Sequence, residues 1–283
     1  MVFAKILLYL DLIGLACAII FIVSMKARRV PDAAFFGRIG QLHYAHRGLH
    51  AIQAGIPENS IRAFRLAANN GYGAELDVRL SRDGKLVVMH DESLKRTTGA
   101  NANVSAVNTQ VLSQLTLEGT REKVPFLEDV IPLFMGKSTL LIELKPENGN
   151  HAELAEKVTD MIRQYPGLSF MVESFDPRVL LWFKKHHPEY IRGQLSENYF
   201  KDKDCKLSWP LRFLLTNLMT NIITRPDFIA YKYEDRDGLA PNLCKKIWSP
   251  KFFWWVVPSQ DAANQLLRAG DKLIFEGFAA KQK

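Results

Sequence analysis

The stretch Gly73-Ala-Glu-Leu-Asp-Val-Arg-Leu80 decides the fold of this chain. Side chains alternate between the two faces of a β-strand, so Glu75, Asp77 and Arg79 share one face while leucine and valine occupy the other. Two carboxylates on one face of so apolar a strand are costly to desolvate unless a cation lies between them. The stretch therefore predicts a buried strand with either a divalent-metal site or carboxylates paired with arginines. For an isolated Glu-x-Asp, arginine pairing is the commoner case.

Strand and helix patterns alternate along the chain after residue 40. Further strands are expected at residues 41–45, 85–89, 138–144, 169–172, 228–231, 252–257 and 272–275. Helices are expected at residues 61–71, 125–135, 152–165, 177–186 and 262–269. Residues 91–125 are polar with little periodicity and are expected to leave the core. Strands separated by helices over about 250 residues predict a parallel α/β fold, and the (β/α)8 TIM barrel has the matching size. We place this barrel at residues 40–283.

Reactive side chains occur in or at the carboxyl ends of several predicted strands. They are His46, Glu75, Asp77, His90, Glu143 and Lys145. In a barrel these strand ends meet at one mouth, where the active sites of this fold lie. Each residue alone has a structural explanation, such as a satisfied histidine or a helix-capping acid. Their joint placement favours a single active site at the mouth.

The first 29 residues form a separate hydrophobic segment. Between Ile6 and Met25 the only charge is Asp11, and the run is long enough to cross a membrane as a helix. We interpret residues 1–29 as a single-pass membrane anchor. A cleaved signal peptide is the competing interpretation, although the run is longer than the usual apolar region of such peptides.

Charge is concentrated beside this segment. Lys26, Arg28 and Arg29 follow the apolar run and Lys5 precedes it, which favours a cytoplasmic catalytic domain by a narrow margin. With Asp11, these residues give the first 29 positions a net charge of +3 out of the total of +7. A modest positive excess beside a membrane suits anionic lipid headgroups, and the sequence has no nucleic-acid-binding motif.

An ordered series of motifs resembles the glycerophosphodiester phosphodiesterase family. The series is His46-Arg47-Gly48, Pro57-Glu58-Asn59-Ser60, Glu75-Leu-Asp77, Asp83-Gly84, Val87-Val88-Met89-His90-Asp91, Leu94-x-Arg96-Thr97-Thr98 and Ile142-Glu143-Leu-Lys145, with a weaker continuation at Ser174-Phe175-Asp176-Pro177 and Trp255. Any one piece is weak, whereas the order of the whole series is specific. The resemblance implies a (β/α)8 barrel with a small subdomain inserted after His90, at about residues 91–125.

The resemblance also implies roles for individual residues. It implies that Glu75, Asp77 and Glu143 bind a metal, that His46 and His90 form an acid/base pair, and that Arg47 and Lys145 contact the phosphate. Phe175 and Trp255 are candidates for packing against the glycerol, with ordinary core positions as the alternative. Three carboxylates prefer a hard cation with oxygen ligands, so one Mg²⁺ or Ca²⁺ is expected.

The expected activity is metal-dependent hydrolysis of glycerophosphodiesters to glycerol 3-phosphate and an alcohol. A metal ion and two cationic side chains stabilise charge on the phosphoryl oxygens, and two histidines can transfer protons at neutral pH. The attacking group is either water or the glycerol 2-hydroxyl, which gives a cyclic phosphate. The alternatives are lysophospholipase D-type hydrolysis of membrane lysophospholipids and an inactive, membrane-tethered barrel that binds lipid headgroups.

The C-terminal part departs from the family pattern. Trp255-Val-Val-Pro258 replaces an expected Trp-Thr-Val-Asn, and the late acidic motif is reduced to Phe275-Glu276-Gly277. These departures concern substrate preference more than the metal centre. Residues 207–223 carry one charge among large apolar side chains, which suits a helix at a membrane interface. The alternative is an ordinary barrel helix that faces the core.

Overall fold

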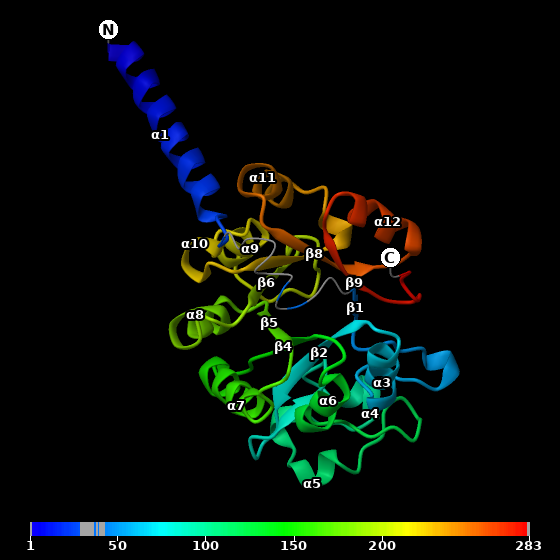
Figure 1. The fold of residues 1–283 in the computed structure, drawn as a ribbon. Helices are drawn as coiled ribbons and strands as arrows, with labels where there is room; N and C mark the ends of the chain where they lie inside the picture. Colours follow the sequence, from blue (N-terminus) through cyan, green and yellow to red (C-terminus); the bar gives the residue numbers. More distant parts are fainter. Residues whose placement is uncertain (1, 29–36, 38, 40–42, 282–283) are drawn as a thin grey trace.

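The computed structural model describes residues 2–28, 37, 39 and 43–281, and its centre is a closed barrel of parallel strands (Figure 1). The barrel strands are β1 (Tyr44–Ala45), β2 (Gly73–Leu80), β4 (Leu140–Leu144), β5 (Phe170–Ser174), β6 (Arg192–Ser196), β7 (Phe228–Lys232), β8 (Lys251–Val257) and β9 (Lys272–Phe275). Each strand pairs in parallel with the next, and β1 closes the ring by pairing with both β2 and β9. The predicted (β/α)8 barrel is confirmed.

Helices cover the outside of the barrel. They are α3 (Ile61–Asn69), α6 (Leu127–Phe134), α7 (His151–Arg163), α8 (Pro177–His186), α9 (Trp209–Thr216), α10 (Asn221–Thr224), α11 (Leu239–Trp248) and α12 (Gln260–Arg268). Three of them begin at a residue whose side chain caps the helix. Ser60 accepts from the backbone N–H of Ala63 at 3.1 Å, Asp176 from that of Arg178 at 2.9 Å, and Ser259 from that of Ala262 at 3.3 Å. The inward faces of these helices and the outward faces of the strands form the larger hydrophobic core.

Two elements of the barrel are missing from the sequence-based prediction, namely β6 and α11. The five residues of β6 read Arg-Gly-Gln-Leu-Ser, which has no apolar run, yet all are buried. Their burial is tolerated because the polar groups have partners: Arg192 lies 3.6 Å from a carboxylate oxygen of Asp227, and Gln194 donates to the carbonyl of Ser174 at 3.2 Å. Hydrophobic pattern alone does not identify such a strand.

Two other predicted strands are present but differ from the prediction in their extent or pairing. The one at 85–89 is β3 (Leu86–Val88), which pairs antiparallel with β2 and lies outside the parallel ring. The one at 41–45 is β1 over its last two residues, and positions 41 and 42 lie outside the described residues.

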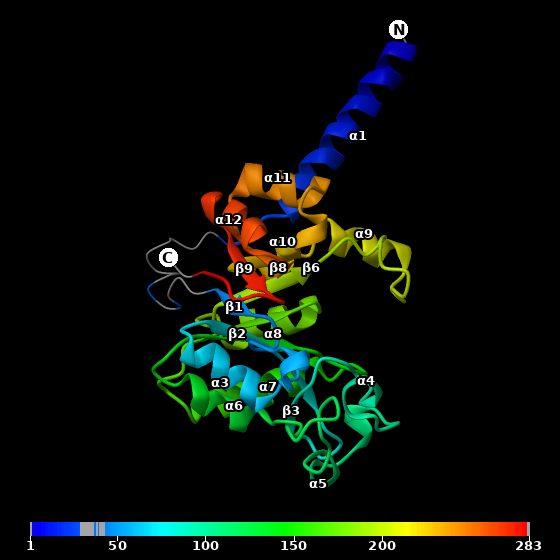
Figure 2. The ribbon, with the colours of Figure 1, turned by 90° about the vertical axis from the view of Figure 1, so that its right-hand side faces the viewer.

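Between β3 and α6 the chain leaves the barrel. This part contains α4 (Lys95–Thr98), the 3-10 turn η2 (Val104–Ala106) and α5 (Thr109–Leu112). It packs around a small core of its own, made by Val87, Met89, Leu94, Val104, Leu112, Leu117, Val124 and Phe126. In Figure 2, α4 and α5 lie beside β3 at the end of the molecule far from α1.

The helix α1 (Val2–Ser24) projects away from the barrel in both views (Figures 1 and 2). Lys5–Ser24 is long and apolar enough to cross a membrane, and of these residues only Ser24, at the end next to the barrel, is buried. A helix of this length and composition serves either as an anchor or as a signal sequence.

The inside of the barrel is a second, smaller core. On β6, Gly193 faces the ring of Phe228 from the neighbouring strand, and a Cβ built on this glycine would lie 2.2 Å from that ring. The aromatic ring therefore occupies the space that any other residue at this position would need.

We expect Gly193→Ala to lower the free energy of unfolding by about 1–3 kcal/mol, because the added methyl overpacks the barrel interior. The matched control is Gly167→Ala, where the only neighbour within 4 Å is the terminal methyl of Met135 at 3.1 Å, which can move aside. Urea unfolding in detergent, followed by tryptophan fluorescence, measures both. Equal midpoints for the two variants would contradict the packing argument.

Candidate active site

Three buried carboxylates lie together at the mouth of the barrel. Glu75 and Asp77 project from β2, and Glu143 projects from β4, where it is the register partner of Asp77. One oxygen atom from each of the three lies within 4.8 Å of the others. Among the described residues, no group hydrogen-bonds to Glu75 Oε1 or Asp77 Oδ1, although both atoms are buried. Convergent carboxylate oxygens with unused lone pairs fit a hard divalent cation such as Mg²⁺ or Ca²⁺.

Two basic side chains lie against the same carboxylates. Lys145 Nζ is 2.7 Å from Glu143 Oε1 and 3.3 Å from Asp77 Oδ1. Arg47 Nε is 3.5 Å from Asp77 Oδ2, and the backbone N–H of Arg47 donates to Glu75 Oε2 at 3.0 Å. The cluster thus combines the geometry of a metal site with the arginine pairing that an isolated Glu-x-Asp suggests.

The three acids differ in pKa. Burial and the charges of Asp77 and Glu143 hold the pKa of Glu75 well above its usual range. Burial also raises the pKa of Glu143 to about 7, although Lys145 opposes the effect. For Asp77, Lys145 and its other cationic neighbours outweigh burial and lower the pKa. A divalent cation would favour ionisation of all three acids.

Both candidate histidines are held through Nδ1 by a carboxylate. His46 Nδ1 is hydrogen-bonded to Glu276, and His90 Nδ1 lies 2.6 Å from Asp91 Oδ1. This leaves Nε2 of each ring for a substrate, and Nε2 of His46 lies 4.0 Å from Glu75 Oε2. Burial lowers the pKa of both imidazoles, that of His90 to about 4, so both rings are neutral at pH 7.

A chain of ion pairs links the two sides of the mouth. Arg96 Nε donates to Asp91 at 2.6 Å, and the same guanidinium donates to both oxygens of Glu58 at 2.9 and 2.6 Å. Glu58 in turn accepts from Arg47 at 2.9 Å. Arg96 therefore fixes the acid that orients His90, and Glu58 holds Arg47 toward the carboxylates. Motifs that lie far apart in the sequence form one network.

Local backbone geometry brings the first two motifs together. Arg47 and Asn59 both have positive φ, at 53° and 51°, and the N–H of Asn59 donates to the carbonyl of Arg47 at 2.9 Å. The side chain of Asn59 then donates to Asp77 at 2.8 Å. Gly48 is required beside them, because its φ is 81° and a Cβ would lie 2.8 Å from that of Ala63.

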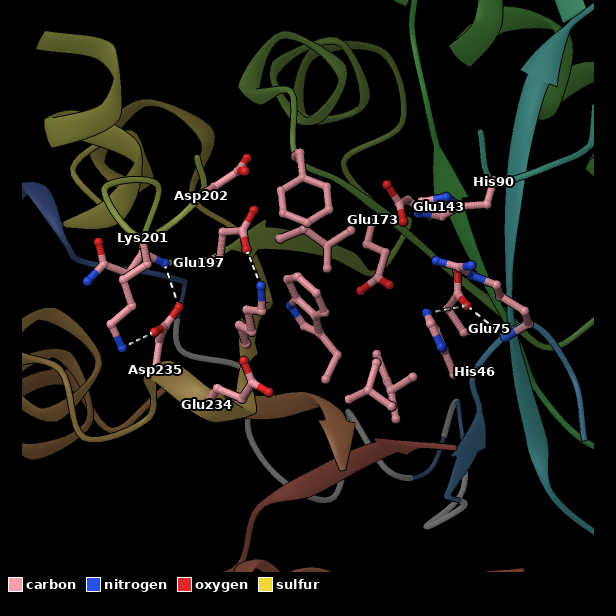
Figure 3. A pocket seen from close by; sticks show the side chains of 18 of the residues that line it. His46, Glu75, His90, Glu143, Glu173, Glu197, Lys201, Asp202, Glu234 and Asp235 are labelled. Atoms are coloured by element: carbon pink, nitrogen blue, oxygen red, sulfur yellow. Dashed lines mark hydrogen bonds and ion pairs between the residues drawn. The ribbon is translucent and has the colours of Figure 1, made fainter. Parts of the chain in front are cut away.

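A cavity of about 660 Å³ extends from the carboxylates across the mouth (Figure 3). Most of the predicted site residues line it, namely His46, Arg47, Glu75, His90, Glu143, Phe175 and Trp255. Asp77 and Lys145 do not line the cavity. Lys145 contacts Glu143, which does line it, and Asp77 contacts Lys145. The rings of Phe175 and Trp255 pack edge to face at 5.5 Å and form an aromatic wall. The structure thus brings all the predicted residues to one place.

The far side of the cavity is charged. Lys232 lies 2.8 Å from Glu197, and Lys201 lies 2.6 Å from Asp235. Figure 3 shows Glu197, Lys201 and Asp235 across the cavity from His46, Glu75 and Glu143. The sequence contains no motif that marks these four residues. Glu197 and Lys201 follow β6, Lys232 is the last residue of β7, and Asp235 lies in the 3-10 turn η3 (Tyr233–Asp235).

Two acids close to the predicted site are absent from the prediction. Glu173 on β5 is the register partner of Glu143 and lines the cavity, and neither of its oxygens is hydrogen-bonded to a described residue. Burial and the neighbouring acids raise its pKa well above the usual range. Its position two residues before Phe175, on the same face of the strand, is the signal that could have identified it.

Glu276 is the second missing residue. It follows β9 and holds His46 although the two residues are 230 positions apart. The sequence signal is the shortened acidic motif Phe275-Glu276-Gly277, which we expected to shape the substrate pocket. The structure shows instead that Glu276 contacts His46, the histidine next to Glu75.

A TIM barrel whose mouth combines convergent carboxylates, oriented histidines and cationic groups defines a hydrolase of phosphoric esters. The family model for the glycerophosphoryl diester phosphodiesterase family matches residues 46–213. The chain belongs to this family and is a glycerophosphodiester phosphodiesterase by family. The resemblance inferred from the ordered motifs is confirmed.

Relatives support this assignment along most of the chain. A glycerophosphodiester phosphodiesterase of Caldanaerobacter subterraneus is 30% identical over 235 residues, which cover 80% of this chain and 89% of the relative. Glycerophosphodiester phosphodiesterase 1 of mouse is 31% identical over 74% of this chain and 70% of its own length. A rat lysophospholipase D is 32% identical over a shorter match, 44% of this chain and 41% of the relative.

Solved structures share the fold. A phosphodiesterase of Oleispira antarctica, determined in complex with the product sn-glycerol-3-phosphate, superposes with a TM-score of 0.68 at 24% identity, covering 83% of this chain and 92% of that one. A glycerophosphodiester phosphodiesterase of Thermotoga maritima gives a TM-score of 0.61 at 25% identity, covering 83% and 94%.

We expect Arg96→Gln to lower the free energy of unfolding by roughly 1 kcal/mol at pH 7, because Asp91 and Glu58 lose a shared partner. Although burial opposes it, hydrogen bonds from Arg96 and His90 lower the pKa of Asp91 to about 2. A lowered pKa stabilises the fold above the unfolded-state value and loses that effect as the pH falls through the folded-state value. The difference from wild type should therefore shrink from about pH 4 to about pH 2.

The measurement is urea unfolding of both proteins across this pH range. The matched control is Arg178→Gln, which also removes an arginine bonded to an aspartate, Asp176, but lies outside the network at the mouth. Only the Arg96 variant should also lower kcat, because only it leaves His90 less well oriented. Unchanged kcat in both variants would contradict the positioning role of the network.

Proposed function

We propose that the protein hydrolyses glycerophosphodiesters to glycerol 3-phosphate and an alcohol, with Glu75, Asp77 and Glu143 holding one Mg²⁺ or Ca²⁺. The observation that carries the proposal is the convergence of these buried carboxylates beside two histidines, each held through Nδ1. A bound cation supplies Lewis-acid stabilisation of the charge that develops on the phosphoryl oxygens. The proton transfers and the positioning fall to the side chains of the chain itself.

Arg47 and Lys145 are the proposed phosphate contacts. Burial opposes a charged lysine, but Glu143 and Asp77 raise the pKa of Lys145, so the ammonium persists at the floor of the site. A guanidinium and an ammonium directed at the same point stabilise a phosphoryl group more strongly than they would in water, because the site is largely shielded from solvent.

His46 and His90 are the proposed acid/base pair. Both are neutral at pH 7, so Nε2 of one ring can accept the proton of the attacking hydroxyl or water. The other ring must donate a proton to the leaving alkoxide. A bound phosphodiester brings negative charge close to both rings, which raises their pKa toward values suited to proton donation.

The aromatic wall is the proposed glycerol subsite. Phe175 and Trp255 line the cavity beside the carboxylates, and the indole Nε1 of Trp255 is buried with no hydrogen-bond partner among the described residues. A flat apolar surface with one unused donor suits a small polyol, which offers both C–H groups and hydroxyl oxygens.

We propose that the chain has three segments. Residues 1–29 are a retained anchor, residues 40–283 are the catalytic barrel, and residues 91–125 form a subdomain inserted in it. The fully buried side chain of Met25, just after α1, supports retention, because its removal would uncover part of the barrel surface. The basic residues after α1 favour a barrel on the cytoplasmic side.

We expect the full chain in detergent to release glycerol 3-phosphate from glycerophosphocholine and glycerophosphoethanolamine only when Mg²⁺ or Ca²⁺ is present. His46→Ala removes a proton-transfer group and should lower kcat by about 100-fold to 10,000-fold. Glu75→Ala should abolish the response to the cation. Release of glycerol 3-phosphate, measured with a coupled dehydrogenase, gives all three results.

The matched control is His186→Ala, which removes an exposed histidine at the C-terminal end of α8, does not line the cavity at the mouth, and should leave kcat unchanged. Turnover that persists in EDTA, or that survives His46→Ala, would reject the proposed chemistry. Absence of turnover with every diester would favour the remaining alternative, an inactive barrel that binds headgroups.

A second candidate is the hydrolysis of membrane lysophospholipids. Two observations favour it: the apolar helix α1, and the match of part of this chain to a rat lysophospholipase D. In liposomes we expect the full chain to release choline from lysophosphatidylcholine as well as from glycerophosphocholine. Choline release from the soluble diester alone would reject this candidate and retain the first.

A further inference from the structure

The helix α1 is fixed to the barrel at its C-terminal end. The indole N–H of Trp248 on α11 donates to the carbonyl of Ile22 at 2.8 Å, and the side chain of Asn221 on α10 donates to that of Met25 at 3.0 Å. Met25 itself is fully buried. The direction of α1 therefore determines which side of the barrel faces a membrane that α1 enters.

A row of aromatic rings runs from this junction toward the mouth. Phe21 on α1 lies 6.3 Å from Phe213 on α9, measured between ring centroids. Phe213 stacks on Trp209 at 5.6 Å with an angle of 10° between the planes, and Trp209 lies 6.1 Å from Phe200. We call these four residues the aromatic row. Figures 1 and 2 both show α9 at the level where α1 meets the barrel.

The outer part of the row is exposed. Trp209 has 66% of its surface accessible and Phe200 has 45%, and Leu211 and Leu214 on α9 are also exposed. In contrast, Leu215 is buried against the barrel. The helix thus has an inward apolar face, which holds it to the barrel, and an outward apolar face without a partner among the described residues. Clustered apolar exposure of this kind indicates an interaction surface.

We propose that the aromatic row is a second membrane contact, with α9 lying along the lipid–water interface beside the anchor. The partner is a bilayer that contains anionic lipid. Continuity with α1 supports this partner, because the row begins on the last turns of a helix long enough to span a membrane. Tryptophan favours the headgroup level of bilayers, and the exposed Lys203 and Lys206 in the preceding loop can reach anionic headgroups.

The placement connects the membrane surface with the mouth. Phe200 adjoins Lys201, which lines the cavity of the candidate active site. A second cavity of about 510 Å³ is lined by Phe200 and Phe213 and shares Lys201 and Asp235 with the first. A substrate with an acyl chain can therefore pass from the bilayer along the row to the mouth. This consequence, unlike the membrane contact itself, rests on the proposed function.

The test of the contact uses the full chain reconstituted in liposomes of phosphatidylcholine and phosphatidylglycerol. Leu211→Cys, in a background with Cys17→Ser and Cys205→Ser, carries an environment-sensitive fluorophore, while Cys244 is buried and unreactive. The matched control is Val111→Cys, an exposed apolar position on α5 at the far end of the molecule. We expect blue-shifted emission, quenched by nitroxide-labelled acyl chains, at position 211 and not at 111.

Water-like, unquenched emission at both positions would overturn the membrane contact. This readout does not depend on activity, so it decides the proposal even for an inactive protein. Quenching at both positions would also overturn it, because the barrel would then have no preferred membrane-facing side.

A second measurement tests the consequence for substrates. We expect the double variant Phe200→Ser and Trp209→Ser to lower kcat/KM for lysophosphatidylcholine in liposomes by roughly tenfold, because interfacial apolar area is lost. Turnover of soluble glycerophosphocholine should stay unchanged. Equal losses on both substrates would assign the row a role in folding rather than in membrane contact. If wild type turns over neither substrate, the proposed function fails while the fluorescence result stands.

Discussion

The architecture of the mouth depends on how the charge of Asp77 is balanced. Two unit charges about 5 Å apart repel by about 3 kcal/mol at an effective dielectric constant of 20, so three ionised acids in this cluster could not persist alone. Lys145 contacts one carboxylate oxygen of Asp77 and Arg47 contacts the other, to which the amide of Asn59 also donates. These contacts tie β4, the loop after β1 and the start of α3 to one carboxylate of β2. The buried charge is therefore a structural constraint as well as the basis of the site.

The register of the strands places acids from three neighbouring strands at one level of the barrel. Parallel pairing places Glu143 opposite Asp77 and Glu173 opposite Glu143, so three neighbouring strands contribute one carboxylate each to the same level of the barrel. A shift of one residue in any of these strands would turn its acid toward the helices. Close packing inside the barrel, such as the fit of Phe228 against Gly193, helps to hold the strands in one register.

The sequence predicts those parts of the structure that short-range pattern determines. The alternation in β2 and the order of the motifs were enough for the barrel, the carboxylate cluster and the two histidines. The strand β6 escapes prediction because its burial depends on partners such as Asp227, which lie far away in the chain. Glu276 escapes for the same reason, since its contact with His46 exists only once β9 closes against β1. A local motif can mark an acid such as Glu276, but it does not show which distant residue the acid contacts once the barrel closes.

The same distinction applies to the polar network around the mouth. Glu58 and Arg96 belong to separate motifs, and nothing in either motif indicates that they bind each other. Their pairing joins Arg96, in the region between β3 and α6, to the loop before α3, and the same guanidinium holds Asp91, the acid that orients His90. This region, which packs on its own small core, therefore contacts the candidate active site through Arg96.

The junction of α1 with the barrel fixes the orientation of the barrel relative to this apolar helix. A flexible tether would raise the local concentration of the barrel near a membrane but leave its orientation random. Here the carbonyls at the end of α1 accept hydrogen bonds from α10 and α11, so orientation and attachment come from the same contacts. A barrel whose mouth is already oriented relative to the bilayer loses less rotational freedom when it binds a substrate embedded in lipid. If α1 acts as the proposed anchor, it would therefore also contribute to catalytic efficiency toward a lipid-derived diester.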